Sequence, residues 1–277
     1  MFAISPAPLS AKFLLRALSC LALSAACASA QADRNALWNL IEGRCVPHAQ
    51  AGQAPEPCAQ VQLQPDRDHG WVLLKDLKGP LQYLLMPSNQ VPGVESPLLY
   101  RPDTPNYTEQ AWQARSLLDR RNGRPLPHDV VSLTVNSKYR RSQDQLHIHI
   151  SCTTRELRAR LLAAQDEITA GWTPLSGGWL RHAWYVRRVD AATLARTNLF
   201  ADAAAALPGS AGVAGDPGRL TVGVVGLQFK DAREGFVLMA SAFDPQDRYS
   251  GSSEDDMQDH DCALLGPKVP EVAAAGR

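Results

Sequence analysis

The sequence predicts an α+β fold in which an antiparallel β-sheet carries helices packed on one face. Short runs of apolar residues alternate with polar ones, which is the period of half-buried strands. Tight polar turns join several of these runs, and such turns connect antiparallel neighbours. Other segments repeat their apolar residues at helical spacing, so amphipathic helices should cover the sheet.

Composition sets the broad class of the protein. Its 277 residues are 45% hydrophobic, and the formal net charge at pH 7 is zero. This is an ordinary globular composition. We predict a single domain over residues 31–265 and a disordered, alanine-rich tail over 266–277. The neutral charge balance gives no reason to expect nucleic acid as a partner.

The first elements follow from apolar spacing and from turn residues. Apolar residues at helical spacing predict a short helix over 35–42. A composition rich in Pro, Gln and Gly predicts a loop over 46–68. Apolar runs on either side of the turn 76–80 predict a hairpin of two strands, 71–75 and 81–86.

The middle of the chain should complete the sheet. Helical spacing continues over 107–121, and the following Asn122-Gly123 pair should end that helix. Two strand patterns come next, 130–135 and 145–152. The long helix would pack on one face of the sheet that these strands form with the hairpin.

The remaining elements are shorter. Thr153 and Glu156 form a capping box that should open a helix to about residue 169. The other expected elements are a strand at 184–189, helices at 190–195 and 200–207, and paired strands at 221–225 and 236–239.

The most informative stretch is the strand 145–152, in which polar and apolar residues alternate without a break. Gln145, His147 and His149 should therefore point to one face of the strand. The two imidazoles then stand about 6–7 Å apart at their Cα atoms. A polar strand face of this kind is often only a solvated surface, so its neighbours must decide between the two interpretations.

The loop 136–143 before this strand is polar and basic. Its sequence is Asn-Ser-Lys-Tyr-Arg-Arg-Ser-Gln. An imidazole nucleophile beside cations and hydroxyl donors is suited to attack on phosphorus, because those groups stabilise the charge on phosphoryl oxygens. The pattern therefore favours phosphate-directed histidine chemistry over a solvated face.

The polar strip formed by Gln145, His147 and His149 resembles the motif of the histidine-triad superfamily. This strip and several other segments together resemble bacterial CDP-diacylglycerol pyrophosphatases. The matching segments are Lys75-Asp76-Leu77, Gly79–Pro87, Glu95–Leu99, Thr104-Pro105-Asn106, Ala111–Arg115 and His147–Cys152. The resemblance extends from about Cys45 to Cys262. Gln145 stands where the triad motif has its first histidine.

The resemblance implies a histidine-triad-like fold and hydrolysis of CDP-diacylglycerol to CMP and phosphatidate, without a metal or other cofactor. His147 matches the nucleophile, which would form a covalent nucleotidyl-histidine. His149 would contact the phosphate and help bear its charge. Ser142 would assist the leaving oxygen.

Further polar residues are candidate substrate contacts. Asn136 would orient a ribose or a phosphate, and Ser137 and Lys138 belong to the same loop. Gln145 can hydrogen-bond a phosphate oxygen through its amide, although it is neither a cation nor an acid. Lys75, at the hairpin tip, is a candidate contact for a phosphate or for the membrane surface.

The N-terminus predicts export. Lys12 and Arg16 precede the short apolar run 17–26, and Ala28-Ser29-Ala30 offers a cleavage site. We expect residues 1–30 to be a signal peptide or, as the resemblance implies for some relatives, a retained N-terminal membrane anchor. The protein would then act on the periplasmic side of the inner membrane and meet its lipid substrate at the membrane surface.

Cysteine usage agrees with an oxidising compartment. Cys45, Cys58, Cys152 and Cys262 lie beyond the signal, and these four thiols allow three pairings. We favour Cys45 with Cys58, which closes a short Pro-rich loop. That choice leaves Cys152 to pair with Cys262.

Other functions are compatible with the same residues. The strip could serve a hydrolase or nucleotidyltransferase that acts on another nucleotide diphosphate. His147 and His149 could instead form part of a metal-binding module without turnover, because two histidines on a strand are a common ligand pair. A non-enzymatic envelope binding protein is a further possibility, although the cluster of polar groups on one strand edge argues against it.

Overall fold

The protein is described by a computed structural model that covers residues 33–207, 213, 215–248 and 250–266. The predicted signal or anchor over 1–30, and the predicted tail beyond Gly266, lie outside these described residues. Within them the α+β class and the antiparallel sheet are confirmed: every strand pairing is antiparallel. The same residues form no helix that is long and apolar enough to cross a membrane.

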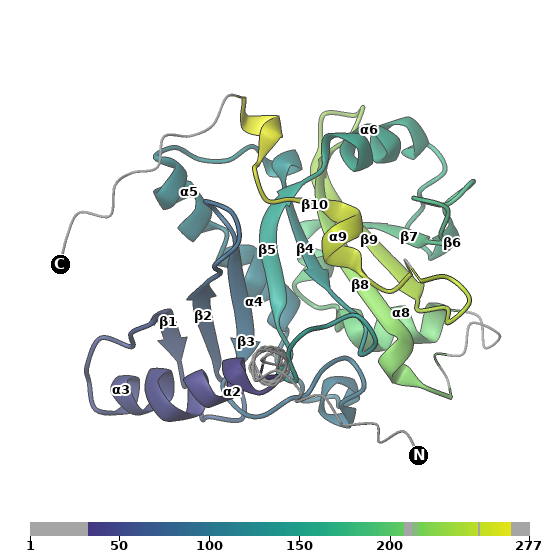
Figure 1. The fold of residues 1–277 in the computed structure, drawn as a ribbon. Helices are drawn as coiled ribbons and strands as arrows, with labels where there is room; N and C mark the ends of the chain where they lie inside the picture. The colour runs from purple at the N-terminus through teal and green to yellow at the C-terminus, as the bar shows by residue number, and fades with distance from the viewer. Residues whose placement is uncertain (1–32, 208–212, 214, 249, 267–277) are drawn as a thin grey trace, which may run out of the picture. The chain divides into compact units, whose positions relative to one another are not determined.

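The fold is built on one antiparallel sheet, in which the order of the strands differs from their order in the chain (Figure 1). Its strands are β1 (Cys58–Gln62), β2 (Trp71–Lys75), β3 (Tyr83–Pro87), β4 (Val131–Val135), β5 (Ile148–Thr153), β6 (Thr173–Pro174), β7 (Tyr185–Val189), β8 (Leu220–Gln228), β9 (Glu234–Ala242) and β10 (Gln258–Asp259). The order across the sheet is β1-β2-β3-β5-β4-β8-β9-β7-β6, and β10 pairs with the end of β5. The strand that carries the histidines is therefore central.

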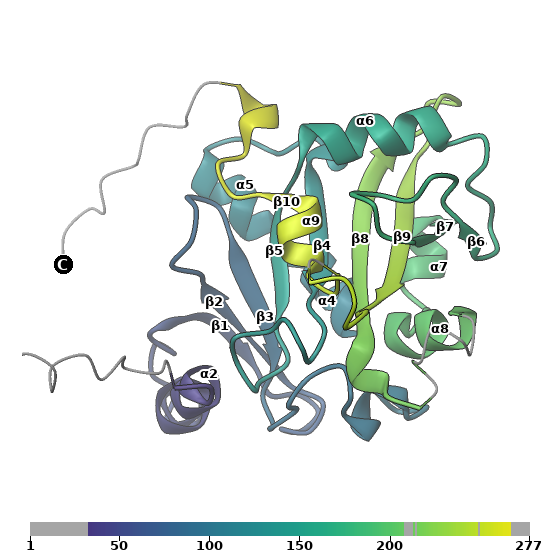
Figure 2. The ribbon, with the colours of Figure 1, turned by 45° about the vertical axis from the view of Figure 1, so that its right-hand side comes forward.

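Helices cover both faces of the sheet, so the predicted one-sided packing is wrong. One face carries α4 (Tyr107–Gln113), α5 (Ser116–Asn122), α7 (Ala191–Leu194) and α8 (Leu199–Ala206). The other face carries α2 (Ala36–Leu40), α3 (Val46–Gln50), α6 (Arg155–Ala164) and α9 (Ser253–Met257). Figures 1 and 2 show α9 lying across the middle strands on this second face. The central strands are buried on both sides, which alternation alone does not reveal.

A single row of paired residues explains how the second face is divided. Leu84, His149, Thr134, Gly223 and Met239 are successive cross-strand partners from β3 to β9. Paired residues point to the same face. Leu84 belongs to the apolar cluster under α2 and α3, and Met239 belongs to the cluster under α6. The polar strip around His149 therefore lies between two apolar patches.

A glycine lets α9 approach this polar strip closely. A Cβ atom on Gly223 would lie 2.3 Å from Met257 Cε, so a side chain there would displace the end of the Met257 side chain. Met257 is fully buried in the cluster that also contains α6 residues. The close packing brings α9 onto β4 and β8, next to the strand with the histidines.

Several predicted boundaries in the first half are wrong. The N-terminal helix does not end near Gly43; it continues through a π-helical turn, Ile41–Cys45, into α3. That turn buries Ile41 and Cys45 against the sheet, which outweighs the propensity of glycine to end a helix. The predicted loop 46–68 also contains β1.

The middle helices also differ in detail from the prediction. The helix expected over 107–121 is divided into α4 and α5, and Gly123 ends α5 in the left-handed conformation with φ of 76°. The cap of α6 is Thr154 rather than Thr153, because the Thr154 side chain accepts from Leu157 N–H. The hairpin, β7, the helix that begins after Asp190 and the β8–β9 pair are confirmed.

Both preferred disulfides are present. Cys45 pairs with Cys58, at a sequence separation of 13 residues, and Cys152 pairs with Cys262, at a separation of 110 residues. The second bridge fixes the C-terminal segment to the end of β5. It therefore also fixes the position of α9 and β10 relative to the histidine strand.

The two bridges should differ in their contribution to stability. In the chain-entropy account a bridge stabilises more when it closes a longer loop, by about 3 kcal/mol for ~15 residues and about 4.7 kcal/mol for ~100. We expect the double variant Cys152→Ser/Cys262→Ser to lose roughly 1.5–2 kcal/mol more than Cys45→Ser/Cys58→Ser. Urea unfolding of the two variants measures this difference, and equal losses would contradict it.

Candidate active site

His147 lies immediately before β5 and is buried, with 7% of its surface exposed. Its Nδ1 atom is 2.6 Å from the carbonyl oxygen of Gln145. A carbonyl only accepts, so Nδ1 carries the proton and donates it. Nε2 then carries the lone pair. Burial lowers the pKa of His147 below its ordinary value of 6.5, which keeps the imidazole neutral and nucleophilic.

His149, two positions along the strand, has the opposite tautomer. Gln82 Nε2 is 2.5 Å from Asp76 Oδ2 and 3.1 Å from His149 Nδ1. The carboxylate identifies that Gln82 atom as the donating nitrogen, so His149 Nδ1 accepts and Nε2 carries the proton. Burial and the neighbouring His147 lower the pKa of His149 to about 3. The centroids of the two imidazole rings lie 4.8 Å apart.

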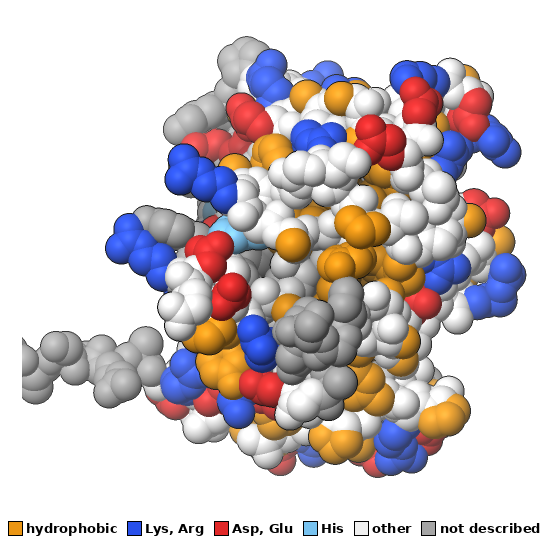
Figure 3. Space-filling view, turned by 90° about the vertical axis from the view of Figure 1, so that its right-hand side faces the viewer, with side chains coloured by type: hydrophobic (Ala, Val, Ile, Leu, Met, Phe, Trp, Pro, Cys, Tyr) orange, Lys and Arg blue, Asp and Glu red, His pale blue; other side chains and the backbone are white. Residues whose placement is uncertain are grey.

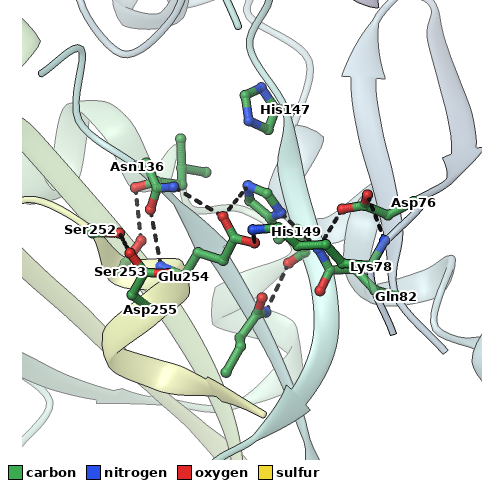
Figure 4. Close-up of polar contacts among 12 residues, drawn as sticks. Asp76, Lys78, Gln82, Asn136, His147, His149, Ser252, Ser253, Glu254 and Asp255 are labelled. Carbon is green, nitrogen blue, oxygen red and sulfur yellow. Dashed lines mark hydrogen bonds and ion pairs between the residues drawn. The ribbon is translucent and has the colours of Figure 1, made fainter. Parts of the chain in front are cut away.

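Glu254 faces the protonated nitrogen of His149. Its Oε2 is 3.3 Å from His149 Nε2, while its Oε1 is 3.1 Å from Lys78 Nζ and 3.3 Å from His260 Nε2. Asn136 completes the group: its Nδ2 donates to Glu254 Oε2 at 3.2 Å, and its Oδ1 accepts from Glu254 N–H at 3.0 Å. Figure 4 shows this network, with His147 beside it.

The charge state of Glu254 follows from these partners. Burial alone would raise the pKa of Glu254, since it disfavours the carboxylate. The hydrogen bond from His260 and the positive charge of Lys78 outweigh burial and hold the pKa well below its ordinary value. The site therefore contains a permanent buried anion whose charge is matched by Lys78.

The C-terminal segment brings Glu254 into the site from a remote part of the chain. β10 pairs with the end of β5, and Gln258 Nε2 donates to the carbonyl oxygen of His149 at 3.2 Å. The Cys152–Cys262 disulfide joins the same segment to β5 covalently. Nothing local in the acidic run around Glu254 distinguishes it from a solvated surface, so sequence reasoning missed it. His260, which the same segment carries, was not among the predicted site residues either.

The predicted loop residues are divided between the site and the surface. Asn136 joins the network as described above. Ser137 is fully buried, and its N–H donates to Gly251 O at 2.9 Å. Lys138 and Ser142 have exposed side chains. The assistance that Ser142 would give to the leaving oxygen, and the phosphate contact of Lys138, stay predictions.

The side chains of two other predicted substrate contacts, Gln145 and Lys75, form hydrogen bonds within the protein. Gln145 donates through Nε2 to Pro87 O at 3.0 Å and Asn89 O at 2.9 Å, and its Oε1 accepts from Val91 N–H at 3.2 Å. It thus holds the segment after β3 instead of facing the imidazoles. Lys75 donates to two carbonyl oxygens of its own turn, at 2.6 and 2.8 Å. The cation beside the site is its neighbour Lys78.

The basic loop does not offer its buried guanidinium to a ligand. Arg141 forms two parallel hydrogen bonds to Glu95, each 2.7 Å long, and a further one to Asp144 at 2.9 Å. Arg34 also binds Asp144, at 2.8 Å. These pairs fix the loop shape. Histidine surface nevertheless reaches solvent between acidic and basic side chains (Figure 3).

The described residues do not form a metal centre. Among residues 33–266, apart from the undescribed gaps, side chains of His, Cys, Asp and Glu do not gather in groups of three or more that could hold a metal ion. The histidines instead bind a carbonyl, an amide and a carboxylate.

Comparisons with known proteins agree with the resemblance seen in the sequence. A family model described as CDP-diacylglycerol pyrophosphatase matches residues 32–266, which include the whole described sheet. A CDP-diacylglycerol pyrophosphatase of Yersinia pestis is 38% identical over 240 residues, covering 86% of this chain and 87% of the relative. The chain therefore belongs to the CDP-diacylglycerol pyrophosphatase family of enzymes.

Proposed function

We propose that this enzyme hydrolyses the pyrophosphate bond of CDP-diacylglycerol, giving CMP and phosphatidate, with His147 as the nucleophile. Family membership supports the reaction. The observation that carries the mechanism is the hydrogen bond from His147 Nδ1 to Gln145 O, because it leaves Nε2 with a lone pair on a neutral ring. The ring is buried directly before the central strand and held by this hydrogen bond, which restricts its orientation, as an oriented nucleophile requires.

In the first step His147 Nε2 attacks the phosphorus of the cytidylyl group. The P–N bond forms as the P–O bond to phosphatidate breaks, and the bonding pair leaves on the phosphatidate oxygen. This leaving group is a phosphomonoester, whose second pKa is about 6, so it departs as an anion near neutral pH. The attacked ring becomes cationic, and the Gln145 carbonyl stabilises it by accepting from Nδ1–H.

In the second step water attacks the same phosphorus. The P–O bond to water forms, the P–N bond breaks and its electron pair returns to Nε2. The water oxygen is then part of CMP, and its proton is released. Lys78 supplies positive charge beside His149, which suits the charge that develops on phosphoryl oxygens in both steps.

The finer parts of the assignment are proposals too. We place the strip in the histidine-triad-like class on the strength of His147 and His149, with Gln145 departing from the motif. His149 would contact the phosphate and help bear its charge, and Ser142 would assist the leaving oxygen. The predicted export signal and the two disulfides support action at the periplasmic side of the inner membrane.

A trapped intermediate tests the mechanism directly. Rapid quenching of enzyme with excess CDP-diacylglycerol should give protein heavier by one cytidylyl group, and peptide mapping should place it on His147. A phosphoramidate is more easily hydrolysed in acid than in base, so the label should survive an alkaline quench. His147→Ala should carry no label, whereas His69→Ala, a change at a half-exposed histidine on a loop, should be labelled like the wild type.

Isotope incorporation gives an independent readout. In water enriched in ¹⁸O, the proposed route places the heavy oxygen in CMP and leaves phosphatidate unlabelled. Heavy oxygen in phosphatidate would mean attack on the other phosphorus and would refute the assignment. Turnover that persists in EDTA separates this chemistry from the metal-module alternative, and transfer of the cytidylyl group to an added alcohol would favour the transferase alternative.

A further inference from the structure

We propose that Leu77, at the tip of the β2–β3 hairpin, inserts into the lipid–water interface that holds the substrate and thereby docks the active site on the membrane. This inference rests on the proposed function, because the occupant of the surface is the bilayer in which a diacylglycerol nucleotide resides. The docking surface is defined as Leu77 with its neighbours Lys78 and Arg121.

The exposure of Leu77 is the first observation. Its relative accessibility is 102%, whereas the other exposed large hydrophobic side chains reach 37% for Leu98, 47% for Tyr139 and 50% for Leu180. A leucine that contacts nothing in the protein leaves its whole apolar surface in water. Transfer of that surface into an apolar phase would therefore be favourable, by about 1.5–3 kcal/mol for a whole leucine side chain.

The tip is not a loose loop. The Lys75 ammonium donates to Asp76 O at 2.6 Å and to Gly79 O at 2.8 Å, which closes the turn from inside. Gly79 has a φ of +59°, and a Cβ there would lie 2.5 Å from His260 O. The turn is therefore held by its own lysine and packed on the C-terminal segment, so it presents Leu77 in a fixed direction.

The tip is connected to the histidines by two routes. Asp76 binds Gln82, which donates to His149 Nδ1. Lys78 pairs with Glu254, which faces His149 Nε2. A surface that receives Leu77 therefore lies at the entrance to the catalytic network and not at a remote part of the molecule.

Positive charge flanks the exposed leucine. The Lys78 side chain is 59% exposed, and Arg121 of α5 is exposed while its Nε donates to Pro80 O at 2.5 Å. Figures 1 and 2 show α5 beside the turn that joins β2 to β3. An apolar side chain with cations around it matches an interface whose substrate and product carry phosphate groups.

Other aromatic and apolar side chains in loops are already used inside the protein. Trp172 Nε1 donates to Asp202, Trp179 Nε1 donates to the carbonyl of Asp256, and Leu175 is 4% exposed. These three side chains therefore have partners within the protein. Among the described residues, Leu77 is the large hydrophobic side chain that is most available to lipid.

Vesicle binding tests the proposal without relying on turnover. Purified protein is sedimented with phosphatidylcholine vesicles that contain a fraction of phosphatidate. Leu77→Ser should weaken binding by roughly 10-fold to 100-fold, the range expected when one leucine no longer enters an apolar phase. Leu180→Ser, at the next most exposed leucine, should bind like the wild type. Equal binding by both variants, or no binding by the wild type, would overturn the proposal.

Activity measurements separate docking from catalysis. Leu77→Ser should hydrolyse a short-chain, water-soluble CDP-diacylglycerol at the wild-type rate and lose about 10-fold or more on vesicle-borne substrate. Equal losses on both substrates would mean that the tip acts through the active site, against docking. A wild type that hydrolyses neither substrate would refute the proposed function, yet the vesicle-binding comparison would still decide the docking proposal.

A tryptophan placed at the tip reports insertion directly. The tryptophan introduced by Leu77→Trp should add fluorescence to that of the native tryptophans, and this added emission should shift to the blue when vesicles are present. Brominated lipid should quench the added emission. Leu180→Trp, measured in the same way, should show no such change. An unchanged spectrum for Leu77→Trp in vesicle-bound protein would place the membrane contact elsewhere and overturn the proposal.

Discussion

Replacing His147 with alanine is expected to abolish turnover almost completely, lowering kcat by at least about 10⁴-fold, or roughly 5.4 kcal/mol of activation free energy. The reason is that the variant has no lone pair at the position of Nε2, so the covalent intermediate cannot form. KM should change much less than kcat, since the cation Lys78 and the Asn136–Glu254 pair remain. Steady-state kinetics on micellar CDP-diacylglycerol measures both constants.

Two further variants make this result specific. His147→Gln keeps most of the side-chain volume but offers no imidazole, so it should be as inactive as His147→Ala. Added imidazole can occupy the space that alanine leaves, and it should restore part of the turnover of His147→Ala but not of His147→Gln. His147→Ala activity within 10-fold of the wild type would assign the nucleophile to another residue.

Replacing Glu254 with glutamine is expected to have the second largest effect, a loss of about 10-fold to 100-fold in kcat, as is typical when a partner that orients a functional histidine is removed. The amide no longer balances the charge of Lys78 and no longer places a negative charge 3.3 Å from His149 Nε2. The matched control is Asp255→Asn, which removes the same charge from the adjacent exposed residue, whose carboxylate binds Ser252.

The pH dependence distinguishes a positioning role of Glu254 from a merely structural one. Burial lowers the pKa of His147, so the acid limb of kcat/KM in the wild type should lie below the ordinary histidine value of 6.5. The Glu254 anion opposes this shift by favouring the imidazolium forms of both histidines. Its removal should therefore move the acid limb to still lower pH, whereas Asp255→Asn should leave it nearly in place. An unmoved limb in Glu254→Gln would contradict the positioning role.

The free energy of unfolding should decrease as the pH falls. The folded-state pKa of His149, about 3, lies below its ordinary value of 6.5, so the unfolded chain binds more protons between these values. The contribution of this buried neutral histidine is complete above pH 6.5 and is lost as the pH falls toward 3. The lowered pKa of Glu254 acts in the same direction as the pH falls below the ordinary value of 4.5. Both groups therefore favour unfolding in acid.

Much of the architecture was predictable because it depends on local patterns. The alternation of polar and apolar residues predicted a strand around His147 and His149. Apolar runs and the turn residues between them predicted the β2–β3 hairpin and the β8–β9 pair. The helix boundaries were less predictable. The chain continues as helix past Gly43 because Ile41 and Cys45 gain burial there, and only tertiary packing provides that gain.

Residue identities and spacings were enough to predict the α+β class, the histidine pair, a preferred pairing of the four cysteines and the resemblance to a family. Each depends on residue identity or on short-range spacing. Only the tertiary structure shows that Glu254 and Lys78 lie next to His149, and that Gln145 and Lys75 hydrogen-bond to backbone groups of the protein. Contacts of this kind join residues from opposite ends of the chain, and they arise when β10 pairs with β5 and a disulfide fixes α9 over the strip. No local pattern specifies such contacts, because their free energy comes from packing across the whole sheet.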